Sequence, residues 1–230
     1  MVNVEGYVNS FLESLDKFVR ENINELTGID LAEFYNGVFK KLKENYFGGS
    51  WGFAGVTEFL LYRVLYYIGV EKYNERPRKL EKLSRDLRVT YFTRPRLALS
   101  AGRPLILGGT KKWIDIMVYE TSEADIANIR RLKSAIEIKA YPQRGIKGLQ
   151  ETVERLKNIH KFYGEPDTKL ALVVYNVYAT NKQRSKVCKY LLKNPIGDID
   201  PIPDYIDVFI MSQKEGKGNE RIKNLLMNYI

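Results

Sequence analysis

The chain has very few of the residues that build sulfur- and histidine-based sites. Among 230 residues there is one cysteine, Cys188, and one histidine, His160. A single cysteine excludes an internal disulfide and a zinc site made of cysteines. A single histidine on a lysine-rich helix argues against a serine–histidine–acid triad. The low cysteine content fits a reducing compartment, so we expect a cytoplasmic protein.

Long apolar runs are also missing. No stretch approaches the ~20 consecutive apolar residues that a membrane-spanning helix needs. The first residues, 1–13, are amphipathic and acidic, unlike a signal peptide. The segment Gly48–Ser50 is not followed by the lysine of a phosphate-binding loop. We therefore expect a soluble protein with no membrane partner, and 44% hydrophobic with 28% charged residues is typical of a globular domain.

Basic residues are unevenly distributed along the chain. Residues 1–47 hold five Lys and Arg and eight Asp and Glu, which gives a net charge of −3. The whole chain has a net charge of +9, so residues 48–230 carry +12. A basic body favours a polyanionic partner, and we expect DNA. A lysine-rich surface that only keeps the protein soluble would have the same composition, so charge alone leaves both interpretations open.

Two amphipathic helices are predicted at the start of the chain. Apolar residues recur every three or four positions over Val4–Ile23, and Gly28 then ends this helix. Asp30, with Glu33 three residues later, is typical of the capped start of a second helix. We expect residues 1–47 to form a helical hairpin outside the main domain, used for packing or as the contact of a homodimer.

The main domain, residues 48–230, alternates between helical and strand patterns. We predict helices at 56–68, 78–87, 122–131, 149–163, 182–193 and 220–229, and strands at 89–99, 104–107, 112–119, 134–141, 170–175 and 205–210. This order predicts an α/β domain with a mixed central β-sheet flanked by helices.

Two of the predicted strands carry charges among apolar residues. In Ala135–Tyr141, strand alternation puts Glu137 and Lys139 on one face, roughly 7 Å apart. The preceding strand carries Asp115. Charges in the middle of a strand are costly unless they are paired, solvated or bound to a metal. If the two strands are neighbours, Asp115 and Glu137 lie side by side and can share a hard cation such as Mg²⁺.

An acid on one core strand, followed by acid–any residue–lysine on the next, resembles the pattern of the PD-(D/E)XK nuclease superfamily, which has the restriction-endonuclease-like fold. The match here is Asp115 and then Glu137-Ile138-Lys139. Members often have a glutamate on the helix before the sheet and some have a glutamine on the helix after the lysine strand, and Glu58 and Gln150 match these. The resemblance covers about residues 52–215.

The resemblance implies a magnesium-dependent nuclease that hydrolyses DNA phosphodiesters. Asp115 and Glu137 would bind Mg²⁺ or Mn²⁺ together with the carbonyl of Ile138. Glu58 would bind a second metal or a water of the first, and Lys139 would assist the attacking water. The residues expected to bind the substrate follow the lysine strand: Arg144, Lys147 and Gln150.

Two positions and one interval depart from the family pattern. Ile114 stands where a proline before the first acid is frequent, and Glu154 stands where a tyrosine would mark the exonuclease-like branch. The interval from Asp115 to Glu137 is 22 residues, which calls for a small inserted helix between the strands.

Two rival interpretations stay open from the sequence. A protein that keeps the nuclease fold without turnover would bind nucleic acid or act in assembly, and its binding would be sensitive to salt. An α/β enzyme of another class would have Glu137 and Lys139 as a surface ion pair. The nuclease binds a metal near Glu137, whereas the binding protein does not, and its DNA binding is unaffected by Asp115→Asn. The third interpretation expects Asp115 and Glu137 to lie more than one metal coordination shell apart.

Overall fold

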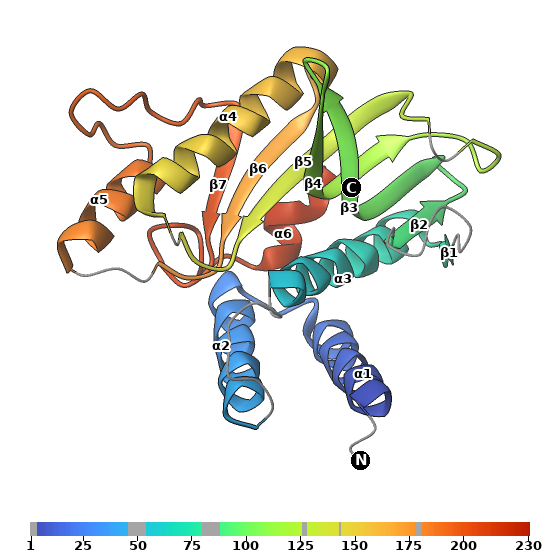
Figure 1. Cartoon of the computed structure of the whole chain (residues 1–230). Helices are drawn as coiled ribbons and strands as arrows, with labels where there is room; N and C mark the ends of the chain where they lie inside the picture. The colour runs from blue at the N-terminus through green and yellow to red at the C-terminus, as the bar shows by residue number, and fades with distance from the viewer. Residues whose placement is uncertain (1–3, 46–53, 80–87, 126–127, 143, 178–180) are drawn as a thin grey trace.

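A mixed β-sheet forms the centre of the protein (Figure 1). The computed structural model describes residues 4–45, 54–79, 88–125, 128–142, 144–177 and 181–230. The strands are β1 (Arg78–Lys79), β2 (Arg88–Phe92), β3 (Leu97–Leu107), β4 (Thr110–Glu120), β5 (Arg131–Lys139), β6 (Lys169–Val174) and β7 (Ile206–Ile210). The helices are α1 (Val4–Asn22), α2 (Gly28–Asn45), α3 (Ala54–Tyr73), α4 (Gly145–Tyr163), α5 (Asn181–Leu191) and α6 (Ile222–Leu226), followed by the 3₁₀ turn η2 (Met227–Tyr229).

The strands lie in the sheet in the same order as in the chain. Neighbours from β1 to β5 are antiparallel, whereas β5, β6 and β7 are parallel. Parallel neighbours need a crossover, and α4 and α5 supply the two that are required. The predicted α/β class, with a mixed sheet flanked by helices, is confirmed.

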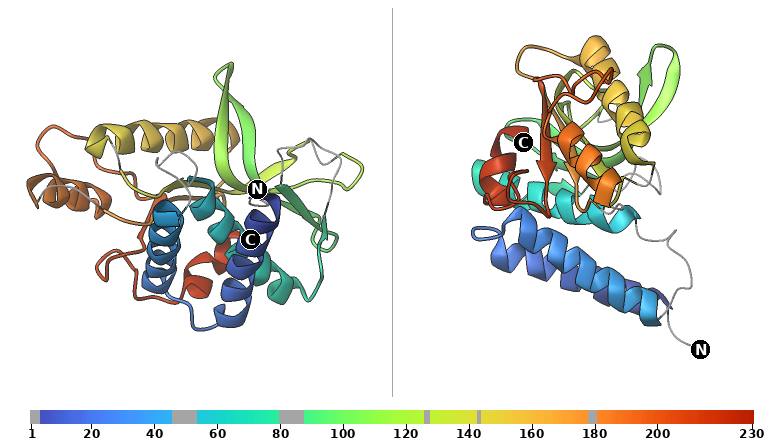
Figure 2. Two further views of the ribbon diagram at one scale, coloured as in Figure 1. Left: turned by 60° about the horizontal axis from the view of Figure 1, so that its bottom comes forward. Right: turned by 90° about the vertical axis from the view of Figure 1, so that its left-hand side faces the viewer.

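Helices cover both faces of the sheet (Figures 1 and 2). One hydrophobic cluster joins the sheet to α3, α6 and η2, and the other joins it to α4 and α5. On β5, Ile136 and Ile138 belong to the α3 cluster and Ala135 belongs to the α4 cluster. Strand alternation therefore directs Glu137 toward α4, not toward solvent.

The two N-terminal helices form as predicted and splay apart beneath α3 (Figure 1). Leu15 of α1 and Leu31 of α2 are fully buried in the same cluster as α3. The rings of Phe18 and Phe34 stack with their centroids 3.8 Å apart. These apolar side chains, which we expected to serve packing or contact with a second copy, are thus engaged within the chain.

The predicted start of the second helix is wrong by two residues. The helix α2 begins at Gly28, and the Asp30 carboxylate accepts hydrogen bonds from the N–H and the hydroxyl of Thr27 (2.9 and 2.6 Å). The Thr27 hydroxyl accepts one in return from the N–H of Asp30 (3.2 Å), which makes Thr27 the cap of a capping box. Gly28 does not end a helix; a Cβ there would lie 3.2 Å from the backbone of Gly218 and 2.8 Å from the Met211 sulfur.

The prediction of a helix at 122–131 is also wrong, because the described residues of this segment, 122–125 and 128–131, are not helical. The Thr121 hydroxyl lies 2.8 Å from the carbonyl oxygens of both Asp125 and Asn128 and can donate to either. Such side-chain bonds to nearby backbone compete with helix formation. The chain turns tightly there, and β5 begins at Arg131.

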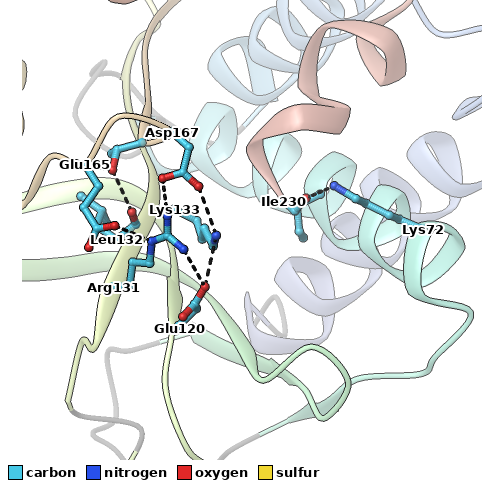
Figure 3. Close-up of polar contacts among 9 residues, drawn as sticks. Lys72, Glu120, Arg131, Leu132, Lys133, Glu165, Asp167 and Ile230 are labelled. Atoms are coloured by element: carbon cyan, nitrogen blue, oxygen red, sulfur yellow. Dashed lines mark hydrogen bonds and ion pairs between the residues drawn. The ribbon is translucent and has the colours of Figure 1, made fainter.

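Ion pairs connect the start of β5 to its neighbours (Figure 3). Arg131 contacts Glu120 (3.7 Å), Glu165 (2.7 Å) and Asp167, and Lys133 contacts Glu120 (3.1 Å) and Asp167 (3.4 Å). Partly exposed pairs contribute little singly, but these share partners from β4, β5 and the turn before β6. They join the three strands at the end of β5 opposite to the predicted site.

Two further segments differ from the predictions. The strand expected at 89–99 is two strands, β2 and β3, joined by a turn. Of the helix expected at 78–87, Arg78 and Lys79 instead form β1, which pairs with β2, and residues 80–87 lie outside the described part of the chain. Among the described residues, no helix is both long enough and apolar enough to cross a membrane.

Candidate functional site

Asp115 and Glu137 come together where β4 separates from β5. The last ladder pair between these strands is Ile116 with Ile136, so the next position sets Asp115 opposite Glu137. Beyond this point β4 continues beside β3 alone as far as Thr110. Longer strands and a turn therefore take up the 22-residue interval, and the inserted helix that we expected is not needed.

The Asp115 carboxylate lies against the backbone of β5. Its Oδ2 accepts a hydrogen bond from the N–H of Ile138 at 2.6 Å. This bond extends the contact between the strands one step past their last ladder pair. Asp115 is therefore held in place before any ligand binds.

Glu137 is completely buried and is held by two basic residues. Arg155 of α4 donates from Nη1 to both carboxylate oxygens, at 3.1 and 2.9 Å. The Lys139 Nζ lies 3.8 Å from Glu137 Oε2. Arg155 also donates to the carbonyl of Trp113 at 3.3 Å. Burial of Glu137 contradicts the interpretation of Glu137 and Lys139 as a surface ion pair.

Both carboxyl groups bind protons more strongly than usual. Burial, and then repulsion from Asp115, raise the pKa of Glu137 to about 8, although Arg155 and Lys139 limit the rise. Burial also raises the pKa of Asp115, against the lowering effects of Lys139, the Ile138 N–H and Arg155. Two adjacent acids that are shielded from water repel each other when both are ionised. A cation between them would relieve this repulsion.

A cavity of about 350 Å³ opens beside the two acids. Helix α3 contributes Glu58, β4 contributes Asp115, and β5 contributes Lys139. The loop before α4 contributes Arg144, and α4 itself contributes Arg155. Glu137 does not line the cavity, because it is buried and its carboxylate is bonded to Arg155. Of the predicted site residues, the cavity therefore collects Glu58, Asp115, Ile138, Lys139 and Arg144.

Gln150 and Lys147 lie elsewhere. They line a second depression, of about 950 Å³, between α4 and the tip of the β3–β4 hairpin. Successive residues of a helix point about 100° apart. The residues of α4 that line the first cavity are Gly148, Leu149, Glu151, Thr152 and Arg155. The structure thus does not bring Gln150 to the carboxylates, although the two depressions share Glu151 and Arg155.

The prediction from sequence missed Arg155. The buried face of α4 consists of Leu149, Thr152, Val153, Leu156 and Ile159. Arg155 lies at the edge of this face, three residues after Thr152. A basic residue beside a buried helical face is a weak signal, and its partner Glu137 is 18 residues away in the chain.

The donor set at this site fits a hard cation. Mg²⁺ commonly binds one or two carboxylates and keeps several waters, and Asp115, Glu137 and the backbone of Ile138 supply such a set. Within the described ranges, no group of three or more His, Cys, Asp and Glu side chains is arranged to hold a metal ion. The fit therefore rests on the pair of repelling acids next to a cavity.

Comparison with known proteins adds no family assignment. No protein-family model matches the chain, and neither the curated proteins nor the solved structures include a significant match.

Proposed function

We propose that the protein is a metal-dependent nuclease that hydrolyses DNA phosphodiester bonds, with a restriction-endonuclease-like fold. The observation that carries the proposal is the placement of Asp115 opposite Glu137 at the split between β4 and β5, with Lys139 3.8 Å from Glu137. Asp115 and Lys139 thus line one cavity, and the second acid, Glu137, is buried beside them under Arg155.

The order of the elements supports the same proposal. Helix α3, which carries Glu58, precedes the sheet, and α4 follows the strand that carries Glu137 and Lys139. This order agrees with the resemblance to the PD-(D/E)XK nuclease superfamily. The charge of +12 on residues 48–230 suits a polyanionic substrate.

Each residue has a defined task in the proposed reaction. Bound Mg²⁺ or Mn²⁺ would neutralise charge on the phosphate and lower the pKa of a water. Asp115, Glu137 and the Ile138 carbonyl would hold this ion, and Glu58 would hold a second ion or a water. Lys139, whose side chain is 29% exposed, would orient the attacking water.

Basic residues at the cavity would bind a phosphate of the substrate. Arg144 lies at the cavity wall with its side chain 76% exposed, 3.5 Å from Glu151, where it can attract a phosphate. Arg155 now covers Glu137, so that metal binding by Glu137 requires Arg155 to turn aside. It would then be available to donate to a phosphate oxygen.

The test is cleavage of labelled single-stranded, duplex and branched DNA with Mg²⁺ or Mn²⁺. Lys139→Ala and Asp115→Asn should each lose cleavage by 100-fold or more, about 3 kcal/mol of transition-state stabilisation. Lys133→Ala is the matched control, because Lys133 is also on β5 and its side chain is also 29% exposed. Equal rates for the wild type and Lys139→Ala on every substrate would refute hydrolysis by this site.

One observation favours a second candidate, a nucleic-acid-binding or assembly protein without turnover. Both Glu137 oxygens already accept hydrogen bonds from Arg155, which is how a site without metal would neutralise a buried acid. Calorimetry with Mg²⁺ separates the two candidates. The nuclease requires heat of binding that Glu137→Gln abolishes, whereas the second candidate predicts no binding by either protein.

A further inference from the structure

The β3–β4 hairpin extends past the rest of the sheet as a two-stranded ribbon (Figures 1 and 2). On one side, the pairing of β2 with β3 ends at Ala101. On the other side, the pairing of β4 with β5 ends at Ile116. Between these points and the tip, β3 and β4 pair only with each other. One edge of this ribbon begins at Asp115, the first residue of β4 beyond the ladder with β5.

The two faces of the ribbon differ in whether their large apolar side chains are buried. Its inner face carries Leu105, Leu107 and Ile114, which are buried in the cluster with α4. Its outer face, which we call the hairpin surface, consists of Gly102, Pro104, Ile106, Lys111 and Trp113. Ile106 is 55% exposed and Trp113 is 53% exposed, the highest values among the large apolar residues that the structure describes.

The hairpin surface leads directly to the proposed site. Trp113 and Asp115 are two residues apart on β4, roughly 7 Å along the strand. By register, Gly102 of β3 lies opposite Asp115, because Ala101 pairs with Ile116. A Cβ at Gly102 would meet no atom within 4 Å. Gly102 therefore places no side chain over the approach from Trp113 to Asp115.

The charge of the hairpin suits a polyanion. Residues 97–114 contain no Asp or Glu. Of their three basic residues, Lys111 lies on the hairpin surface, whereas Arg103 is buried over the Tyr119 ring and Lys112 pairs with Leu105 on the inner face. The Lys111 Nζ lies 5.3 Å from the centre of the Trp113 ring. An exposed aromatic ring with a cation beside it is the arrangement that proteins use to stack a base and neutralise its phosphate.

We propose that the hairpin surface binds an unpaired nucleic-acid strand, with a base stacked on Trp113 and a phosphate paired with Lys111. The face of a base is available for stacking only when the base is not already enclosed in a duplex. The substrate class is therefore single-stranded or branched nucleic acid, and this inference rests on the proposed nuclease function. The strand would pass from Trp113 to the cavity beside Asp115.

Tryptophan fluorescence tests the contact directly. The chain has two tryptophans, and Trp51 lies outside the described residues, so Trp51→Phe leaves Trp113 as the only reporter. The full-length protein is titrated in EDTA with oligo(dT), oligo(U) and a duplex of the same length, and anisotropy of the labelled strand gives the affinity. We expect oligo(dT) or oligo(U) to quench Trp113 and the duplex to quench it far less.

Substitutions establish which side chain binds the strand. Trp113→Ala should weaken binding of the single strand about tenfold, whereas Trp113→Phe should keep most of the affinity. Lys111→Ala should reduce the salt dependence by about one phosphate contact. Tyr205→Ala is the matched control, since Tyr205 is 45% exposed and its ring stacks on His160 of α4 and is not part of the hairpin surface.

Three results would overturn the inference. The first is saturable strand binding without quenching of Trp113, and the second is equal quenching by the duplex. The third is a change in Trp113 emission with protein concentration or with anionic vesicles in place of the strand, which would assign the surface to a second copy or a bilayer. Because binding is measured without metal, quenching without any cleavage would refute the nuclease alone. Cleavage that depends on Lys139 without quenching would refute the hairpin contact alone.

Discussion

Removing the charge of Arg155 should destabilise the protein by an amount that depends on pH. Arg155 is the closest cation to the fully buried Glu137, at 2.9 Å. Arg155→Met keeps the length and helix propensity of the side chain and removes only the guanidinium. In this variant, Lys139, whose Nζ lies 3.8 Å from Glu137, would be the basic residue that still contacts Glu137 among the described residues.

The structure sets the size of the effect. Breaking a buried ion pair costs about 3–5 kcal/mol when the remaining charge stays uncompensated. Here Lys139 stays and Glu137 can take up a proton, so we expect a smaller cost than this range, about 2–3 kcal/mol, at pH 9. At pH 6.5 Glu137, with a pKa of about 8, is already largely protonated. The variant then loses only hydrogen bonds, about 1 kcal/mol.

The sign of the pH dependence follows from the direction of the pKa shift. Arg155 lowers the pKa of Glu137, so its removal raises that pKa further. Above pH 8, Glu137 is ionised in the wild type but still carries a proton in the variant. The free energy of unfolding of the variant therefore falls further below that of the wild type, by about 1.4 kcal/mol for each pH unit. The deficit stops growing at the new pKa.

Urea unfolding followed by circular dichroism at pH 6.5 and pH 9 measures this deficit. Lys157→Met is the matched control, because Lys157 is on the same helix and makes an exposed pair with Glu154 at 3.5 Å. Such a pair contributes about 0–1 kcal/mol. A deficit for Arg155→Met that is equal at the two pH values, or no larger than that of Lys157→Met, would refute the assignment of Arg155 as the counterion of Glu137.

Two other predictions concern metal binding and packing. The pKa of Glu137 is raised to about 8, so Mg²⁺ must displace a proton from Glu137 at lower pH. Calorimetry should therefore show that the Mg²⁺ affinity rises by up to about tenfold per pH unit from pH 6 to 7.5 and levels off above pH 8. A Mg²⁺ affinity that falls or stays constant over this range would contradict the raised pKa. Gly69→Ala should destabilise the protein by about 1–3 kcal/mol, since its Cβ would lie 2.5 Å from the Phe92 ring and 2.7 Å from Ile230. Gly37 is on the exposed side of α2, and a Cβ there would have nothing within 4 Å. Gly37→Ala should therefore stabilise the protein by about 0.5–1 kcal/mol. Thermal unfolding measures both variants, and a loss of stability in Gly37→Ala as large as that in Gly69→Ala would contradict the packing argument.

Periodicity in the sequence determined the main elements of the sheet and its helices. Leu170–Tyr175 is an unbroken apolar run and becomes the buried β6. The spacing of Leu149, Val153, Leu156 and Ile159 predicts α4, and all four are buried. These patterns are local, because a helix or strand repeats its buried face every few residues. For the same reason, alternation alone set Glu137 and Lys139 on one face of β5.

Only the tertiary structure decided which side chains meet. The sequence did not reveal that Arg155 covers Glu137, since this contact depends on how α4 crosses the sheet after β5. Nor did it separate Gln150 from the cavity, because one residue along a helix changes the direction of a side chain by about 100°. The register between β4 and β5 likewise sets Asp115 opposite Glu137. The register of the strands and the angle at which α4 crosses the sheet arise from packing of the whole core. The residue pattern of a single segment therefore does not determine them.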